Sequence, residues 1–386
     1  MRNPLSKTIT SIKPSGIRKF FDIVNTMEDA ISLGVGEPDF DTPYFIRDAG
    51  IYSLEKGRTF YTSNSGLPEL REEIRKYLIR KLNVEYNPKD EIIITVGGSE
   101  GIDIALRAML DAGDEVLIPQ PSYVSYEPCT ILAGGKPVII ELKAEDGFKL
   151  KASQILERVT DKTKILILPF PNNPTGSILN INELKEIAKV CIEKDLYVIS
   201  DEIYCELTYE GEHASIVQVE GMKERTILIN GFSKSYAMTG WRLGYATGPK
   251  EIIAQMTKIH QYAIMCAPTT SQYAAVEALA HGDEDVAKMR ESYNQRRRFL
   301  LHKFDELGMT CFEPQGAFYV FPSIKRFNMT SEEFATRLLE EQKTAIVPGT
   351  AFGASGEGYV RVSYAYSMER LKEAISRIEK FVRSLS

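Results

Sequence analysis

Lys234 lies in a segment whose residues could perform covalent chemistry. The hexapeptide Asn230–Ser235 follows an apolar stretch, Thr226–Ile229, with the composition of a buried strand. Lys234 is therefore expected just beyond the carboxyl end of a strand, which is where open α/β sheets bind ligands. A lysine becomes a nucleophile or a base when burial or neighbouring charge lowers its pKa, and it then forms Schiff bases with carbonyl groups. Taken alone, the same lysine could simply be solvated.

Two charged residues stand where they could serve such a lysine. Arg242 follows eight positions later, and a guanidinium there could clamp a phosphate, although a surface salt bridge over the neighbouring Trp241 explains it equally well. Asp201 ends the apolar stretch 196–200 and should lie near Lys234 in the same sheet. A buried acid needs a partner, such as a cationic ring nitrogen of a cofactor. The alternative is an N-cap for a following helix.

The apolar stretch Ile92–Val96 leads into the glycine-rich segment Gly97–Gly101 at the expected start of a helix. Free backbone N–H groups and the helix dipole favour a phosphate at such a point. The glycines lack the spacing of dinucleotide and nucleotide-triphosphate loops, which argues against a nucleotide-dependent oxidoreductase. A tight turn without a ligand is the alternative.

Two further polar residues could bind a small acid. Asn173 lies in the proline-rich loop 168–176 after another apolar stretch, where it could orient a hydroxyl group or only shape a turn. Arg361 alternates with Val360 and Val362 in an expected strand. It could clamp a carboxylate from a cleft, or lie solvated on an edge strand.

Short apolar runs alternate with amphipathic segments between about residues 90 and 250. Helices are expected at Glu100–Leu110 and Ile181–Lys194, the second with Asn180 as its N-cap. The alternation predicts an α/β fold whose mainly parallel sheet has helices on both faces. The expected strands are Ile92–Val96, Val116–Ile118, Val138–Ile140, Ile165–Leu168, Tyr197–Ser200 and Thr226–Ile229.

After roughly residue 285 the pattern changes to that of an α+β unit. A charged helix is expected at Glu291–Leu307, then a strand at Ala317–Phe321, a helix near Ser331–Glu341, a strand at Tyr359–Tyr364 and an amphipathic terminal helix. A chain of 386 residues exceeds the size of a single core. We therefore expect a large domain, residues 45–285, packed against a smaller one formed by residues 1–44 and 286–386.

The composition excludes several classes of partner. A net charge of −6 and a pI of about 5.6 argue against nucleic acid and anionic membranes, so small molecules are the expected partners. The five cysteines form no CxxC pair and are odd in number, which indicates neither a disulfide framework nor a metal cluster. With no signal-like or membrane-spanning apolar run, a cytoplasmic protein is expected.

In their order along the chain, these motifs resemble those of the class I aminotransferases. The likeness runs from Ser32–Phe40 to Val360–Ala365 and is greatest to a bacterial and archaeal subgroup that includes aspartate, aromatic, alanine and acetyl-diaminopimelate aminotransferases. It implies the fold type I architecture of pyridoxal-phosphate (PLP) enzymes, with a mainly parallel sheet in a large domain beside a smaller α+β domain. It also implies that the cofactor is PLP.

The resemblance assigns the cofactor ring to five residues. Lys234 would hold the cofactor covalently as a Schiff base, and Asp201 would pair with its pyridine nitrogen, whose positive charge makes the ring an electron sink. Tyr204 and Asn173 would bond the ring hydroxyl, and Tyr123 would stack on the ring.

The phosphate and the substrate are assigned in the same way. The phosphate would rest on the backbone of Ser99 and Glu100 and on Arg242, with Tyr61 reaching in from a second subunit, which implies a homodimer with shared active sites. Arg361 would hold the substrate α-carboxylate.

Two glycines, Gly36 and Gly231, also bear on the substrate and phosphate sites that the resemblance implies. Gly36 would let the N-terminal segment close over the substrate. Many relatives carry a serine where this chain has Gly231, so that phosphate contact is lost or is replaced by Ser233. No second arginine can be placed for a distal carboxylate, which leaves strict aspartate specificity in doubt.

The resulting expectation is an aminotransferase that moves an amino group from an L-amino acid to a 2-oxo acid by a ping-pong mechanism. A PLP-dependent carbon–sulfur β-lyase would use the same Lys234, Asp201 and Arg242. A non-catalytic relative should have lost the lysine or its acid, and both are present.

Overall fold

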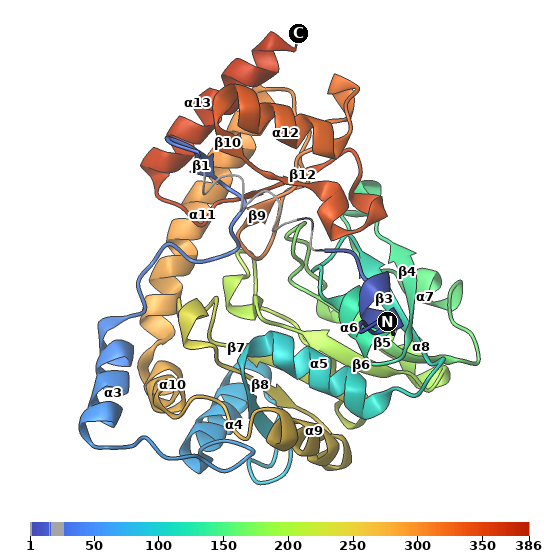
Figure 1. Ribbon diagram of the computed structural model, residues 1–386, viewed down its shortest axis with the longest axis vertical. Helices are drawn as coiled ribbons and strands as arrows, with labels where there is room; N and C mark the ends of the chain where they lie inside the picture. Colours follow the sequence, from blue (N-terminus) through green and yellow to red (C-terminus); the bar gives the residue numbers. More distant parts are fainter. Residues whose placement is uncertain (1, 15, 17–26, 386) are drawn as a thin grey trace.

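The computed structural model describes residues 2–14, 16 and 27–385, and within them a seven-stranded sheet forms the centre of the molecule (Figure 1). Strand β8 runs antiparallel to both of its neighbours, and the other adjacent pairs run parallel. The mainly parallel α/β sheet is therefore confirmed. Its strands, in spatial order, are β2 (Ile92–Thr95), β8 (Gly244–Thr247), β7 (Thr226–Gly231), β6 (Tyr197–Asp201), β5 (Thr163–Leu168), β3 (Glu115–Gln120) and β4 (Lys136–Glu141).

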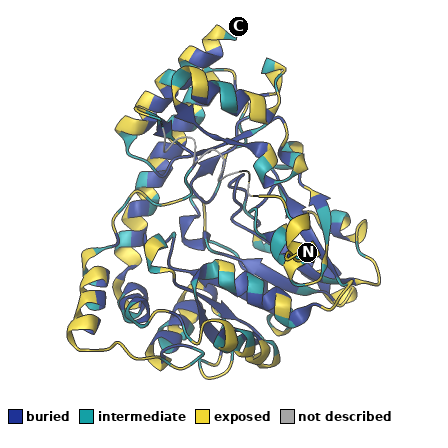
Figure 2. Ribbon diagram, viewed as in Figure 1, coloured by how far each residue is buried: buried dark blue, intermediate teal, exposed yellow. Residues whose placement is uncertain are grey.

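The inner strands are apolar on both faces because helices cover both sides of the sheet. Ile227 and Ile229 of β7 pack on one side with the helices α5 and α9, whereas Leu228 packs on the other side with α4 and α10. Successive side chains of a strand point to opposite faces, so two-sided burial requires a continuous apolar run. Figure 2 shows the result as a sheet that is buried along almost its whole length.

The helices form two layers around this sheet. One face carries α5 (Gly97–Met109), α6 (Tyr126–Leu132) and α9 (Lys250–Ala263), and the other carries α4 (Pro68–Leu82), α7 (Ala152–Leu156), α8 (Ile181–Glu193) and α10 (Thr269–His281), with α3 (Tyr44–Glu55) packed on α10. The predicted N-cap is confirmed, because the Asn180 side chain accepts hydrogen bonds from the backbone N–H groups of Asn182 and Glu183.

A second layer of strands and helices stands above the sheet in Figure 1. Three of its strands form one sheet in the order β11, β12, β9, and β1 pairs with β10. Buried side chains of β1, β9, β10 and β12 pack with the helices of this layer in one apolar cluster, whereas Val347 of β11 packs with residues of the large sheet. The elements are β1 (Ile31–Ser32), α11 (Asp283–Glu306), β9 (Tyr319–Val320), α12 (Ser331–Gln342), β10 (Thr344–Ala345), β11 (Val347–Pro348), β12 (Val360–Ser363) and α13 (Met368–Ser384), with the short α1 (Lys7–Ser11) near the start of the chain.

Three details differ from the sequence-based expectation. Strand β8 was not predicted, because its four residues directly follow the Trp241–Arg242 motif and show no alternation. Strand β9 is shorter than the predicted Ala317–Phe321, since Ala317 has a φ of 59° that ends the extended backbone. Helix α11 begins at Asp283 and not at the predicted Glu291, because three acidic residues favour the helix N-terminus there.

In the described part of the chain, no helix has the length and apolarity to cross a membrane.

Candidate active site

A cavity of about 320 Å³ opens where the carboxyl ends of β5, β6 and β7 meet the start of α5. Residues 34–36 and a residue of β12 close it from the second layer. Most of the residues predicted from the sequence line this one cavity, and they are Gly36, Ser99, Tyr123, Asn173, Asp201, Tyr204, Ser233, Lys234, Arg242 and Arg361. Two others, Glu100 and Tyr61, are not among its lining residues.

Lys234 lies in the turn after β7, with its amine directed across the cavity. Its Nζ donates a hydrogen bond to the backbone oxygen of Gly36 at 2.6 Å. Burial is the main cause that lowers the pKa of Lys234 to about 8, and Arg361 and Arg242 act in the same direction, whereas Glu37 opposes them. More of this amine is therefore neutral at pH 7 to 8 than for an exposed lysine.

Asp201 is the last residue of β6 and is 7% exposed. Its carboxylate accepts hydrogen bonds from the hydroxyl of Tyr126 at 2.7 Å and from the backbone N–H of Ile203 at 3.3 Å. Burial raises the pKa of Asp201 to about 6, although both hydrogen bonds oppose the shift. A 3-10 turn at Cys205–Leu207 follows instead of a full helix. The N-cap alternative therefore does not account for this acid, which is suited to a cationic partner.

The start of α5 leaves space for an anion beside Arg242. Gly97 has a φ of 76°, and a Cβ built there would lie 2.8 Å from Nη2 of Arg242. Arg242 itself has a φ of 51° and donates a hydrogen bond to the backbone oxygen of Thr239 at 3.0 Å. Backbone N–H groups of the first helical turn and a guanidinium thus border the same space, as phosphate recognition requires.

The side chain of Glu100 points away from this space. Its carboxylate accepts a hydrogen bond from the backbone N–H of Val96 at 2.5 Å and lies 2.6 Å from Nδ1 of His260, which is fully buried in α9. Only the backbone of Glu100 could therefore contribute to an anion site, which is the role that the family resemblance implies for it. Its side chain ties the start of α5 to α9.

Arg361 is 2% exposed and lies in the middle strand of its sheet, so the solvated-edge alternative is wrong. Its Nη1 donates to Oδ1 of Asn173 at 2.9 Å, and its Nη2 donates to the backbone oxygen of Gly34. The guanidinium carbon lies 4.4 Å from the centre of the Tyr319 ring. The Tyr319 hydroxyl is in turn 2.8 Å from that of Tyr204. The arginine is therefore held rigidly at one end of the cavity.

Three more of the predicted residues, Ser99, Tyr123 and Ser233, also line the cavity. The Tyr123 hydroxyl lies 3.5 Å from Oγ of Ser99, and Ser233 is 7% exposed.

At Gly231, where many relatives carry a serine, a Cβ would approach the Cα of Gly244 at 3.0 Å. A serine at 231 would need a shift of backbone, because β7 and β8 are in close contact there.

Tyr61 stands apart from the cavity on the molecular surface. It is 80% exposed, and so is the neighbouring Phe60. The backbone oxygen of Phe60 accepts a hydrogen bond from Thr269, and the side chain of Asn64 donates to the backbone oxygen of Met265. The segment around Tyr61 therefore lies against the exposed turn that follows α9.

The comparisons with known proteins agree over nearly the whole chain. The sequence profile of the family described as aminotransferase class I and II matches residues 28–378. A putative aminotransferase, YugH, of Bacillus subtilis is 52% identical over 382 residues, which cover 99% of each chain. An aspartate aminotransferase of Pyrococcus abyssi is 48% identical, with 98% of each chain covered. The solved structure of the aromatic aminotransferase from Pyrococcus horikoshii matches with a TM-score of 0.91 and 45% identity, covering 95% of this chain and 100% of that one.

The chain belongs to the class I and II aminotransferase family. It is a PLP-dependent enzyme that moves an amino group from an amino acid to a 2-oxo acid, and its fold is that of fold type I. Its named relatives are aminotransferases, which favours this reaction over the carbon–sulfur lyase. The predicted family, fold, activity and cofactor are thus confirmed.

The residues of the cavity fit this cofactor. Asp201 offers a buried carboxylate to a ring nitrogen, and Lys234 offers a partly neutral amine to a carbonyl group. The space that a Cβ at Gly97 would fill lies beside Arg242, where a phosphate can approach the helix start. In the described part of the chain, Nε of Arg361 is buried without a hydrogen-bond partner. The aminotransferase cavity therefore has groups for each part of the cofactor and for a substrate acid.

Sequence reasoning missed two aromatic residues of this cavity. Tyr126 binds Asp201, and Tyr319 joins Tyr204 to Arg361. Tyr126 begins α6, Tyr123 precedes that helix, and their rings meet edge to face with centres 5.6 Å apart. The position of Tyr126 three residues after the predicted Tyr123 is the signal that could have indicated it. Tyr319 lies in a uniformly apolar stretch, and nothing in that stretch distinguishes it from a core residue.

Proposed function

We propose that Lys234, Asp201 and Arg361 are the central residues of this aminotransferase, because all three line one cavity. Lys234 holds the cofactor covalently and Asp201 pairs with its ring nitrogen. Tyr204 and Asn173 bind the ring hydroxyl. The other proposed cofactor contacts are Tyr123 against the ring and Ser99, the backbone of Glu100, Ser233 and Arg242 at the phosphate.

Lys234 is also proposed as the base of the reaction. When bound, PLP supplies an electron sink for the negative charge that develops at the substrate α-carbon. Once the substrate amine has displaced it, the Nζ of Lys234 is free to take the proton from that carbon. Its pKa, lowered to about 8 by burial, supports this role because the neutral amine is then available near physiological pH.

Arg361 is proposed to bind the substrate α-carboxylate. Its contacts with Asn173 and Gly34 leave further N–H donors on the same guanidinium, which can form a bidentate pair with a carboxylate. Gly36, whose backbone oxygen accepts a hydrogen bond from Lys234, lies where the N-terminal segment would close over the substrate and exclude water.

The choice of donor depends on what recognises the side chain. Among the described residues that line the cavity, the cations are Lys234, Arg242 and Arg361, and each already has a proposed partner. We therefore propose that no arginine of the same chain selects for a side-chain carboxylate. Donors with apolar or aromatic side chains should react as well as aspartate, unless a second subunit supplies a cation.

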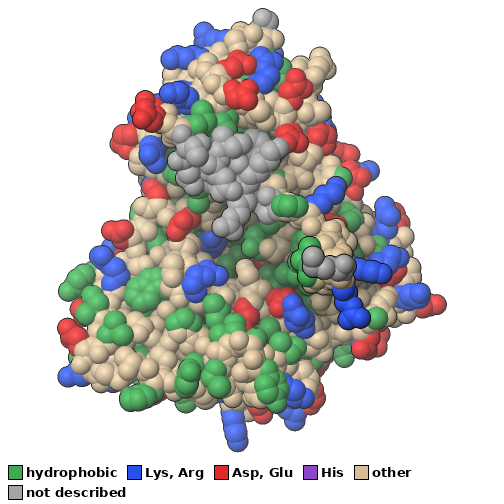
Figure 3. Space-filling model, viewed as in Figure 1, with side chains coloured by type: hydrophobic (Ala, Val, Ile, Leu, Met, Phe, Trp, Pro, Cys, Tyr) green, Lys and Arg blue, Asp and Glu red, His purple; other side chains and the backbone are tan. Residues whose placement is uncertain are grey.

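We further propose a homodimer in which Tyr61 of each subunit completes the site of the other. The supporting observation is an exposed apolar face around Tyr61 that is formed by Tyr44, Tyr52, Phe60, Tyr262, Ile264 and Met265. Figure 3 shows hydrophobic side chains gathered low on the molecule, where Figure 1 places α3 and α9. Patches of this kind mark interaction sites. Sedimentation of the purified enzyme should give the mass of two chains; a single-chain mass would contradict the proposal.

The domain division and the location in the cell also belong to this proposal. The large domain would comprise residues 45–285, and the small domain residues 1–44 and 286–386. All five cysteines are free thiols, which supports a reducing compartment such as the cytoplasm. Limited proteolysis would test the division, since cleavage should concentrate near residues 44 and 285.

The experiment that tests the proposed function is a panel of amino donors presented to the purified holoenzyme with 2-oxoglutarate or pyruvate. Productive donors should change the visible absorbance of the bound cofactor in the absence of an acceptor. Initial rates should give parallel double-reciprocal lines, because the first product leaves before the second substrate binds. Intersecting lines, or release of ammonia from a cysteine conjugate without any acceptor, would contradict the proposal.

A further inference from the structure

The start of α5, where we propose that the cofactor phosphate binds, is packed closely against two strands of the sheet. A Cβ built at Gly244 of β8 would lie 2.6 Å from the carbonyl carbon of Gly97 and 2.7 Å from the nitrogen of Gly98. A Cβ at Gly101 would lie 3.2 Å from Cδ1 of Ile229 in β7. The glycines allow this close approach, but they supply no side chains of their own that could fix the turn.

The carboxylate of Glu100 supplies two contacts on the side away from the cavity. Its Oε2 accepts a hydrogen bond from the N–H of Val96, the N-cap residue of α5, at 2.5 Å. Its Oε1 lies 2.6 Å from Nδ1 of His260. The side chains of Glu100 and His260 are 10% and 0% exposed. Water therefore has little access to this contact, and removal of either side chain would leave the other with a buried polar group that lacks its partner.

His260 lies in α9, which packs along α5 through apolar side chains. Its Nε2 is buried and has no hydrogen-bond partner among the described residues. The contact with Glu100 is therefore the hydrogen bond that the imidazole makes within the described part of the chain. An apolar side chain of similar size would fill the same space without leaving a buried nitrogen unpaired. Packing between the two helices alone does not account for a histidine at this position.

The residues between Val96 and Glu100 border the active-site cavity. Gly97, Gly98 and Ser99 line it, whereas neither Glu100 nor His260 is among its lining residues. Backbone N–H groups bind an anion at a helix start only when they point at the same place, and hydrogen bonds weaken steeply as their angle departs from linearity. Since the Glu100 side chain joins the two ends of the segment 97–99, it restrains the direction of those N–H groups.

We propose that Glu100 and His260 are positioning residues for the cofactor phosphate. His260 holds the Glu100 carboxylate, and the carboxylate holds the segment 97–99 in the shape that presents its N–H groups to the phosphate. This inference rests on the proposed phosphate site. Both side chains act through the turn and not by contact with the cofactor, because they lie outside the lining of the cavity.

This role predicts a loss that is selective for the phosphate. PLP and pyridoxal offer the same ring and the same aldehyde to Asp201 and Lys234, but only PLP carries a phosphate. A displaced turn should weaken the binding of PLP by about 10- to 100-fold and leave the binding of pyridoxal unchanged. A general loss of folding stability would weaken both ligands alike. The ratio of the two dissociation constants therefore reports on the turn itself.

The experiment titrates the full-length, cofactor-free protein with PLP and with pyridoxal in a calorimeter. His260→Leu removes the hydrogen bond to Glu100 and should reduce the preference for PLP. His260→Asn places an amide N–H close to the position of Nδ1 and should restore the preference of the wild type. Glu100→Ala should also reduce the preference. Removal of a carboxylate would by charge alone favour an anion, so a loss in this variant comes from the position of the turn.

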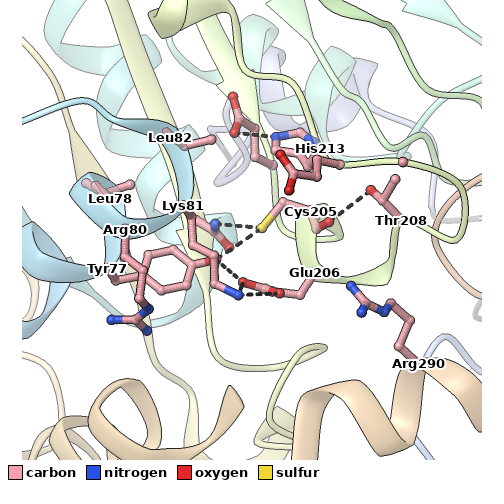
Figure 4. Close-up of a pocket in the computed structure, with 14 residues that line it drawn as sticks. Tyr77, Leu78, Arg80, Lys81, Leu82, Cys205, Glu206, Thr208, His213 and Arg290 are labelled. Atoms are coloured by element: carbon pink, nitrogen blue, oxygen red, sulfur yellow. Dashed lines mark hydrogen bonds and ion pairs between the residues drawn. The ribbon is translucent and has the colours of Figure 1, made fainter. Parts of the chain in front are cut away.

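Tyr77→Phe is the matched control, because it removes a buried hydrogen bond on the opposite face of the sheet. The Tyr77 hydroxyl donates to Glu206 at 2.6 Å, and Lys81 lies 3.1 Å from the same carboxylate. Figure 4 shows these residues beside a separate cavity of about 420 Å³. Tyr77 belongs to α4, whereas α5 and α9 cover the other face. The control should keep the wild-type ratio of the two dissociation constants, even where its Tm falls.

An unchanged ratio in His260→Leu or in Glu100→Ala would overturn the proposal, and so would equal losses for PLP and pyridoxal. A reduced ratio in His260→Asn or in Tyr77→Phe would contradict it as well. If His260→Leu does not fold, Glu100→Ala decides alone.

Arg242→Gln separates this inference from the proposed phosphate site. If that variant keeps the wild-type ratio, the proposed phosphate site is wrong. If it loses the preference for PLP while His260→Leu and Glu100→Ala keep it, the phosphate site stands and only the positioning role of Glu100 and His260 fails.

Discussion

The active-site cavity and the exposed face around Tyr61 differ in what one chain can complete. In the cavity, residues separated by up to 327 positions in the chain converge on one volume of about 320 Å³. On the face, Phe60 and Tyr61 are 80% exposed and Tyr262 is 83% exposed. One chain therefore brings together by itself the residues that we propose for the ring and the substrate. Tyr61, which we propose as a further phosphate contact, lies on a surface that a second copy would have to cover.

The largest effect is expected at the centre of the cavity. Lys234→Ala removes both the covalent link to the cofactor and the base, so kcat should fall by at least ~10⁴-fold. The matched control is Lys250→Ala, because Lys250 is 64% exposed at the start of α9. Steady-state rates with the best donor would check this, and a variant with more than a tenth of the wild-type rate would remove Lys234 from the mechanism.

Asp201→Asn should lower kcat by roughly 10² to 10⁴-fold, because a neutral amide cannot pair with a cationic ring. Steady-state rates with the best donor would measure this loss.

The same change, Asp201→Asn, should stabilise the cofactor-free protein. The pKa of Asp201 is raised to about 6, so the folded state carries an unfavourable buried charge above that pH and loses this penalty as the pH falls toward 4. Melting curves of the cofactor-free protein should therefore show a larger gain in Tm at pH 8 than at pH 5. A loss of Tm at pH 8 would contradict the pKa shift.

Arg361→Lys tests the part of the cavity where we propose that the substrate, and not the cofactor, is bound. An ammonium cannot form the bidentate pair with a carboxylate, so kcat/KM for the amino acid should fall by about 30 to 10³-fold. The cofactor dissociation constant should be unchanged. A loss of cofactor affinity equal to the loss of kcat/KM would mean that Arg361 belongs to the cofactor site.

Tyr61→Phe is the smallest expected effect and tests the face. The ring preserves the apolar surface, while the loss of one hydroxyl contact to the phosphate should weaken cofactor binding by about tenfold. Tyr52→Phe, on the same face, is the control for a surface effect. Equal cofactor affinity in the wild type and both variants would show that this face does not reach the cavity.

The prediction from sequence succeeded where backbone periodicity decides the outcome. The strands that precede Asp201 and Lys234 are continuous apolar runs, so the strands and the positions of their ends were readable. The direction of individual side chains was not readable. Glu100 points to His260 because it lies one position beyond Ser99 on a turning helix. Strand β8 and the left-handed Ala317 depend on tertiary packing, which no local pattern records.

The most direct test of the central claim is to reduce the holoenzyme with borohydride, digest it and measure the masses of its peptides. The peptide that contains Lys234 should gain the mass of one reduced cofactor, and the adduct should be absent from Lys234→Ala. An adduct on another lysine, or an unmodified Lys234 in protein that retains its cofactor absorbance, would contradict the assignment of Lys234 as the residue that holds the cofactor.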